Sequence, residues 1–230
     1  ATIGGTKKFS GGYPHFIEMG LKNKFGDDFI SLFAEGTCAD VNHWDITKPG
    51  PQIGYEEVTK PIGEKLALTI LNKLPEIQKG TPSLGVRSTI INVPLQMYSQ
   101  MDLEWAKSYT GDPPNSIVRT RAKRILHLDE LRNRFGENIP MEIQVIRLSD
   151  ETAIVTLPGQ VFVELGLALK KASPFQNTII ITLANNHEEC IPLRKAYTEG
   201  SYEIIYSRVE AGAGEQIIET ALSLLKELKK

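Results

Sequence analysis

The sequence contains few cysteines, no long apolar run and no excess of positive charge, and each shortage excludes a class of protein. Its two cysteines, Cys38 and Cys190, cannot form a disulfide framework, although one bridge between them is compatible with the sequence. No apolar run is long enough to cross a bilayer, so we expect no transmembrane segment. A formal net charge of -2 and a pI near 6.2 argue against a nucleic-acid partner. The local cations Arg119, Arg121, Lys123 and Arg124 are interpreted as the solvated face of a helix.

Several catalytic motifs are also missing. The chain has no GxSxG nucleophile elbow and no Walker-type phosphate loop. The Gly-rich stretch 210–215 follows no strand–turn pattern, which disfavours a dinucleotide fingerprint. Ala1 cannot act as an N-terminal nucleophile, and the sequence after it shows no signal-peptide pattern. We expect that a segment upstream of Ala1 has been removed.

The composition is that of a folded protein. With 230 residues, of which 41% are hydrophobic, the chain can bury a substantial core, as one large α/β domain or two small ones. No internal repeat, low-complexity tract or linker separates two halves. We therefore predict a single α/β unit over residues 1–230.

The spacing of apolar residues predicts the order of helices and strands. We expect mixed β-sheets flanked by helices, that is, a layered α/β sandwich. Helices are predicted over residues 13–25, 54–74, 161–172 and 212–230, with two more between 102 and 136. Strands are predicted over residues 29–36 and 87–97, in a hairpin within 141–159, and over 177–184 as a strand covered on both faces.

Three polar segments follow predicted strands, where open α/β sheets tend to bind ligands. They are residues 36–45, 157–160 and 185–190, and we expect them to line one cavity. His43, His187 and Cys190 are suitable zinc donors, but no HExxH or CxxC spacing is present. Structural roles stay open for the same residues: Cys38 and Cys190 as buried hydrophobes, His43 as a loop hydrogen-bonding group, and Asn185 and Asn186 as turn residues.

Four motifs together resemble one family. GTCADVNHWD, LPGQVFVELG, ANNHEECIPLRKAYTEGSYE and SRVEAGAGEQIIETALSLL are similar to segments of the neutral/alkaline (non-lysosomal) ceramidases, particularly their shorter bacterial relatives. The likeness runs from FSGGYP to the final helix. It covers the C-terminal part of that family's catalytic domain, so it implies a piece of a larger ceramidase-like domain.

The resemblance implies zinc-dependent amide hydrolysis of a lipid substrate. Family members release a fatty acid from ceramide with metal-activated water, and their zinc is held by two upstream His, a Glu in an LPGE-like motif and a Tyr in a later loop. In this sequence the Glu position is Gln160 and the Tyr position is Cys190, so both metal-ligand positions are substituted. Substrate-binding roles are expected for Asn185, Asn186, His187 and His43.

The two substitutions leave two hypotheses open. Gln160 lacks the charge that offsets Zn²⁺, whereas Cys190 could supply it as a thiolate, because a bound metal lowers a thiol pKa. The chain is either part of an N-acyl hydrolase that needs its missing N-terminal half, or a degenerate homologue that binds a ligand or partner without catalysis. The resemblance favours a periplasmic or secreted protein, although the residues themselves leave the compartment open.

Overall fold

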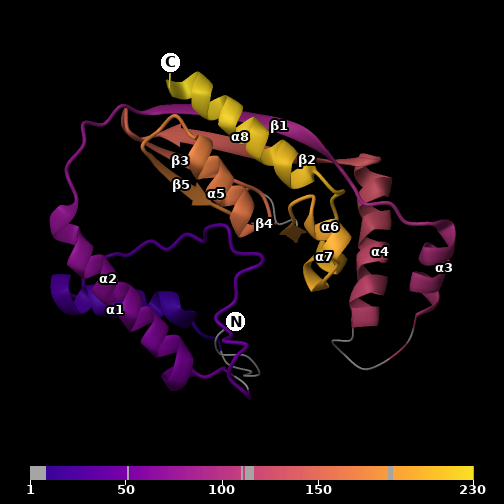
Figure 1. Cartoon of the computed structure of the whole chain (residues 1–230), viewed down its shortest axis with the longest axis horizontal. Helices are drawn as coiled ribbons and strands as arrows, with labels where there is room; N and C mark the ends of the chain where they lie inside the picture. The colour runs from indigo at the N-terminus through magenta and orange to yellow at the C-terminus, as the bar shows by residue number, and fades with distance from the viewer. Residues whose placement is uncertain (1–8, 51, 110, 112–116, 186–188, 230) are drawn as a thin grey trace. The chain divides into compact units, whose positions relative to one another are not determined.

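The chain folds into two compact units in this computed structural model (Figure 1). The structure describes residues 9–50, 52–109, 111, 117–185 and 189–229. The smaller unit contains Ala1–Ala34 and Asn42–Gly80, and the larger contains Glu35–Val41 and Thr81–Lys230. The prediction of a single α/β unit over residues 1–230 stays a prediction.

The smaller unit is a pair of packed helices. Helix α1 (Gly12–Phe25) lies against α2 (Lys60–Lys73), which continues a π-helical turn, η1 (Tyr55–Thr59), and ends in a 3-10 turn, η2 (Leu74–Glu76). Both predicted helices are thus confirmed.

The packed face of α2 is made of small residues. The buried residues of α2 are Gly63 and Ala67, whereas Leu66 and Ile70 are exposed. A Cβ on Gly63 would lie 2.6 Å from the carbonyl oxygen of Tyr13. The helices approach so closely that only small side chains fit between them, which leaves the larger residues at the margin.

The predicted buried strand over residues 29–36 is wrong. This segment is irregular, and Leu32 is 94% exposed. A strand needs neighbouring backbone to accept and donate its hydrogen bonds, and no described strand pairs with residues 29–34. Pairing begins only at its end, where the Thr182 N–H donates to the carbonyl oxygen of Glu35 at 2.9 Å. Apolar content alone did not decide the structure here.

The larger unit is built on a mixed four-stranded sheet in the order β1-β2-β3-β5. Strands β1 (Gly85–Pro94), β2 (Asn138–Arg147) and β3 (Thr152–Thr156) are antiparallel, and β5 (Asn177–Ile181) pairs in parallel with β3. The predicted hairpin is therefore confirmed as β2–β3. Pro94 ends the edge strand β1, where its missing N–H is tolerated. The expected mixed α/β architecture is confirmed.

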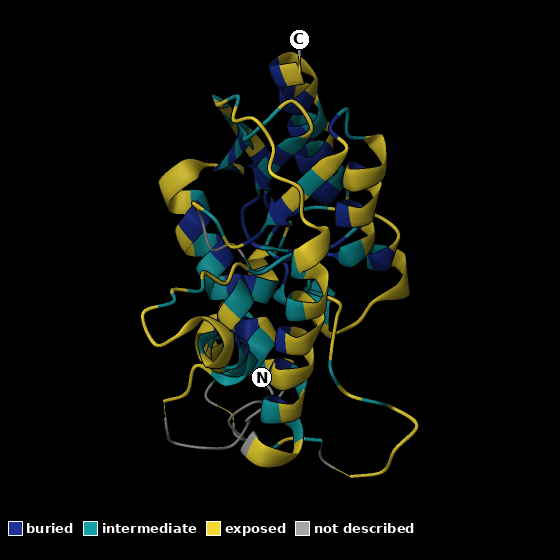
Figure 2. Ribbon diagram, turned by 90° about the vertical axis from the view of Figure 1, so that its left-hand side faces the viewer, coloured by how far each residue is buried: buried dark blue, intermediate teal, exposed yellow. Residues whose placement is uncertain are grey.

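Only one face of this sheet is buried. Along β2, buried Ile139, Met141, Ile143 and Val145 alternate with more exposed residues. Helices α5 (Val163–Ala172) and α8 (Ala213–Lys229) pack against the apolar face. Buried residues alternate with exposed ones along the helix that leads to the C-terminus (Figure 2). The prediction that 177–184 is covered on both faces is wrong, because β5 is an edge strand whose Ile179 is 48% exposed. Its run of isoleucines reflects β-propensity rather than double burial.

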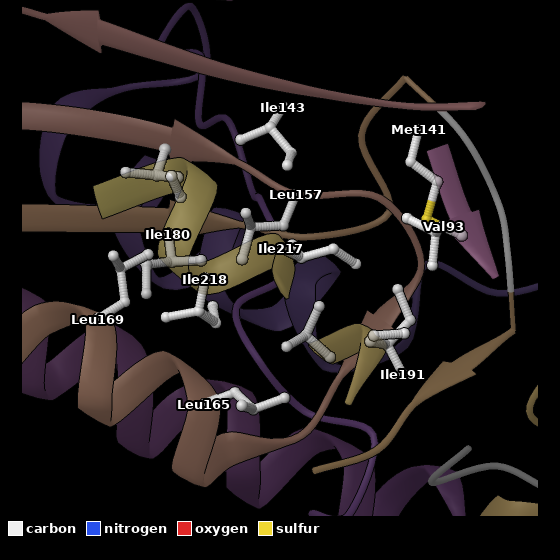
Figure 3. Packing of buried hydrophobic residues seen from close by; sticks show 14 of the residues in the cluster. Val93, Met141, Ile143, Leu157, Leu165, Leu169, Ile180, Ile191, Ile217 and Ile218 are labelled. Atoms are coloured by element: carbon white, nitrogen blue, oxygen red, sulfur yellow. The ribbon is translucent and has the colours of Figure 1, made fainter. Parts of the chain in front are cut away.

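The core forms where the two helices meet the sheet. In Figure 3, Leu165 and Leu169 of α5 and Ile217 and Ile218 of α8 face Ile143, Leu157 and Ile180 from the sheet side. The predicted helices over 161–172 and 212–230 are thereby confirmed. Burial of this cluster fixes the chain segment between β3 and α5 at the end of the sheet, since both its neighbours are anchored.

The remaining elements flank this core. Helices α3 (Gln100–Ser108) and α4 (Ile117–Phe135) confirm the two predicted helical pieces and pack through Leu103, Ala106, Ala122 and Ile125. A Ser99–Asp102 capping box begins α3. The short pair β4 (Gln160–Val161) and β6 (Cys190–Ile191) precedes helices α6 (Ala196–Glu199) and α7 (Tyr202–Tyr206). In the described part of the chain, no helix has the length and apolarity needed to span a membrane.

Gly214 allows the packing of α8 against its neighbours to be tested. A Cβ at buried Gly214 would lie 2.8 Å from the carbonyl oxygen of Pro192 and 2.5 Å from Leu165 Cδ1. We expect Gly214→Ala to lower the free energy of unfolding by about 1–3 kcal/mol despite the better helix propensity of Ala. Urea unfolding measures the change, with exposed Ser223→Ala on the same helix as the control. Equal stability of the two variants would contradict this packing.

Candidate functional site

The two positions that the family resemblance predicts as metal-ligand positions lie side by side. Gln160 and Cys190 are Cα partners in the parallel pair of β4 and β6. The Gln160 N–H donates to the carbonyl oxygen of Glu189 at 2.9 Å, and the Phe162 N–H donates to that of Ile191 at 3.2 Å. The backbone therefore brings together two segments that are far apart in the sequence.

A third segment, Glu35–Val41, joins this pair. The Ala39 N–H donates to the carbonyl oxygen of Val161 at 3.2 Å. The Asp40 carboxylate Oδ1 accepts a hydrogen bond from the Val163 N–H at 2.7 Å, at the first residue of α5. A carboxylate at a helix N-terminus satisfies an otherwise unpaired N–H and interacts favourably with the helix dipole. Parts of all three predicted polar segments thus converge in the larger unit.

The two thiols near this junction are uncharged at neutral pH. Cys190 is only 6% exposed, and burial, assisted by the nearby carboxylates of Glu203 and Glu189, raises its thiol pKa to about 12. Burial and the Glu35 carboxylate raise the pKa of the Cys38 thiol to about 11. Both cysteines are free thiols. The environment therefore favours the structural role that the sequence left open for them over a thiolate.

His43 belongs to the smaller unit and has a local partner. Its Nε2 lies 2.8 Å from the carbonyl oxygen of Gln52, whose side chain also bonds the backbone of Asp45. These bonds tie residues 43–52 into one loop. A substrate-binding role for His43 stays a prediction.

The loop before β6 is described only in part. Asn185 is exposed, and its φ of 66° is a left-handed backbone conformation that Asn adopts more readily than most residues. This geometry suits the turn role proposed for it. Asn186 and His187 lie outside the described residues, so their predicted substrate-binding roles remain predictions.

The described residues do not by themselves fit a zinc centre. Protein zinc sites use at least three His, Cys, Asp or Glu ligands, and no such group of three is present in the described ranges. At the two family positions, Gln160 is neutral and the Cys190 thiol holds its proton. Asp40 already uses one carboxylate oxygen to cap α5.

A cavity that the sequence did not predict lies next to this junction. Its volume is about 1030 Å³, and Glu189, the neighbour of Cys190, is part of its wall. The other lining residues are Ile117, Arg119, Thr120, Lys123, Arg124 and His127 of α4, Tyr202 and Tyr206 of α7, and Arg208. The α4 cations interpreted as a solvated face are exposed at Arg121 and Lys123, but Arg124 is half-buried, and Arg119, Lys123 and Arg124 line the cavity. Their three- and four-residue spacing with Thr120 and His127 was the signal for a shared face.

The raised pKa of Cys190 predicts a stability change at alkaline pH. The unfolded thiol loses its proton near its ordinary value of 9.0, whereas the folded thiol keeps it up to about 12. Above pH 9.0 the folded state therefore binds more protons, and stability falls as pH rises, by at most about 1.4 kcal/mol per pH unit for this group. Cys190→Ser lacks this titration, so its stability should fall less steeply in urea unfolding above pH 9.0.

Cys38→Ser is the matched control for that measurement. The Cys38 thiol pKa is raised only to about 11. Cys38→Ser should therefore reduce the loss of stability at alkaline pH by less than Cys190→Ser does. Identical slopes for the wild type and the Cys190→Ser variant would show that Cys190 is not the buried, protonated group described above.

The fold matches that of solved ceramidases. The chain superposes on neutral ceramidase from Pseudomonas aeruginosa with a TM-score of 0.65 and 13% identity, and on a ceramidase complexed with C2 with a TM-score of 0.65 and 11% identity. Each match covers 97% of this chain, but only 41% and 43% of the two ceramidase chains. No protein-family model and no curated protein sequence matches this chain. The predicted resemblance is confirmed as a likeness of fold: this chain has the fold of about two fifths of neutral ceramidase.

Proposed function

We propose that this chain is part of a ceramidase-like hydrolase that cleaves an N-acyl, amide-type bond. The fold supports the proposal, since nearly the whole chain superposes on neutral ceramidase. Fold alone does not determine function, so the proposal depends on a site. The observation that carries it is the pairing of Gln160 with Cys190, because these are the two ligand positions that this chain would share with the family.

The proposed active site needs residues beyond those described here. We propose that they come from an N-terminal half of the same protein, because this chain spans only 41% of the length of the Pseudomonas enzyme. In this arrangement the chain contributes the floor formed by β4 and β6, with Asp40 fixing the start of α5 beside it. A lipid amide is the substrate class that the fold supports.

A second candidate is a homologue that binds its ligand without catalysis. The chemistry of the two ligand positions favours it. A neutral amide at Gln160 and a thiol with a pKa of about 12 at Cys190 leave no negative charge to offset a divalent cation. Such a protein would keep the cavity and the fold but not the reaction.

Substitution of Gln160 separates the two candidates. In the hydrolase, Gln160→Glu in the full-length protein restores one carboxylate ligand, so zinc affinity should rise by at least about tenfold, equivalent to a gain of ~1.4 kcal/mol. Hydrolysis of a fluorescent N-acyl substrate should rise with it. Zinc competition titration and product release measure the two effects. Gln144→Glu is the control, because it adds the same charge to β2, outside the β4–β6 pair.

Cys190→Ser completes the test. A loss of stoichiometric zinc in this variant would identify Cys190 as a ligand despite its burial. If neither the wild type nor Gln160→Glu hydrolyses the substrate or binds zinc more tightly than Gln144→Glu, the hydrolase proposal fails and the binding homologue remains.

A further inference from the structure

The cavity beside β6 is rich in positive charge. Its wall contains four cationic side chains, Arg119, Lys123, Arg124 and Arg208, but within the described residues its lining includes a single carboxylate, Glu189. The entire lining belongs to the larger unit and comes from α4, α7 and the segments around Glu189 and Arg208. With a chain net charge of -2, this concentration of cations is a local feature rather than a consequence of composition.

The single carboxylate already has a partner. Glu189 Oε1 forms an ion pair with Arg208 Nη2 at 3.1 Å, and both side chains are largely shielded from solvent. A partly buried ion pair is screened less by salt than an exposed one. The charge of Glu189 is therefore offset by Arg208, and the described part of the lining holds no second carboxylate beside Lys123 and Arg124.

Arg124 of α4 is half-buried. Its Nη1 donates to the Gln96 side-chain oxygen, while its Nε is buried without a hydrogen-bond partner in the described chain. Burial lowers the pKa of its guanidinium, and the neighbouring Arg121 adds to the effect. Removing a charge from water is costly unless an opposite charge compensates it. An anion in the cavity would supply that compensation.

The cavity also presents hydroxyl groups and aromatic rings. The rings of Tyr202 and Tyr206 lie 4.3 Å apart, and the Tyr206 hydroxyl is 3.4 Å from Thr120 Oγ1. The hydrogen bond with Tyr206, followed by burial, raises the pKa of Tyr202, so this hydroxyl stays protonated and can donate. Guanidinium, ammonium and hydroxyl donors around one space are the groups that recognise phosphate and sulfate oxygens.

We propose that this cavity binds a phosphate or sulfate group carried by a small organic molecule. Lys123 and Arg124 hold the anionic group beside the Glu189–Arg208 ion pair, and the Tyr202–Tyr206 rings contact its organic part. A cavity of about 1030 Å³ is far larger than a free phosphate ion requires and lies at the upper end of the range for small-molecule sites. The cavity has room for both the charged group and an attached organic portion.

The position of the cavity connects it to the β4–β6 pair. Glu189 contributes its carboxylate to the cavity wall and its carbonyl oxygen to the hydrogen bond with Gln160. If the hydrolase proposal holds, the amide substrate bears its anionic group on this side; that link rests on the proposed function. The proposal that the cavity binds an anion does not rest on the proposed function, because binding is measured without any catalytic readout.

Calorimetric titration of the full-length protein tests the proposal. Glycerol 3-phosphate should bind more tightly than inorganic phosphate, and glycerol should not bind. Lys123→Glu should weaken binding of the phosphate ester by about tenfold or more, because it replaces an attractive charge by a repulsive one. Lys123 is exposed, so this variant should keep its fold, which far-UV circular dichroism checks. Lys226→Glu, the same charge change at an exposed site on α8, should bind like the wild type.

Additional binding measurements identify the source of the anion. Binding to phosphatidic acid vesicles but not phosphatidylcholine vesicles would identify a lipid headgroup, and soluble-ester binding alone would identify a free metabolite. Tyr206→Phe should weaken binding of the vesicles or of the soluble ester, whichever is observed. The proposal is overturned if no phosphate or sulfate compound binds, if inorganic phosphate binds as well as every ester, or if Lys123→Glu behaves like Lys226→Glu.

Discussion

The burial of one sheet face by two helices is the constraint from which the larger unit follows. Leu169 and Ile217 can leave water only if α5 and α8 lie against β2, β3 and β5. Helix α5 must therefore begin immediately beyond the end of β3, which leaves room for only the two-residue strand β4 between them. That strand pairs with β6, and the pairing sets Gln160 beside Cys190. The geometry of the candidate site is thus a consequence of apolar packing rather than of interactions among its polar residues.

Charge is distributed unevenly around this junction. On the Cys190 side, burial and nearby carboxylates keep the thiols protonated, so the paired positions are neutral. On the other side of Glu189, α4 presents several cations to a cavity. The ion pair between Glu189 and Arg208 lies at the boundary between these two environments. A chain that is nearly neutral overall therefore contains a locally basic site next to an uncharged one, and the two favour different chemistry.

The sequence predicted elements well where local pattern and tertiary packing agree. The helices that became α1, α5 and α8 carry apolar residues at helical spacing, and the β2–β3 hairpin alternates apolar and polar residues as a one-face-buried sheet requires. The predictions failed where burial depends on neighbours. Ile30, Leu32, Phe33 and Ile179 are apolar but exposed. Apolar residues make burial favourable, but they do not ensure that a neighbouring element is present to cover them.

By itself, the sequence determined the main helices, the β2–β3 hairpin, the mixed α/β class and the ceramidase-like motifs around Gln160 and Cys190. Each of these follows from local propensity, periodicity or motif, which act over a few residues. Tertiary structure alone decided that Gln160 and Cys190 are neighbours, that the Cys190 thiol is buried, and that α4 and α7 enclose a basic cavity. These features join segments distant along the chain, and their energetics depend on desolvation and on distances between charges that exist only after the chain has packed.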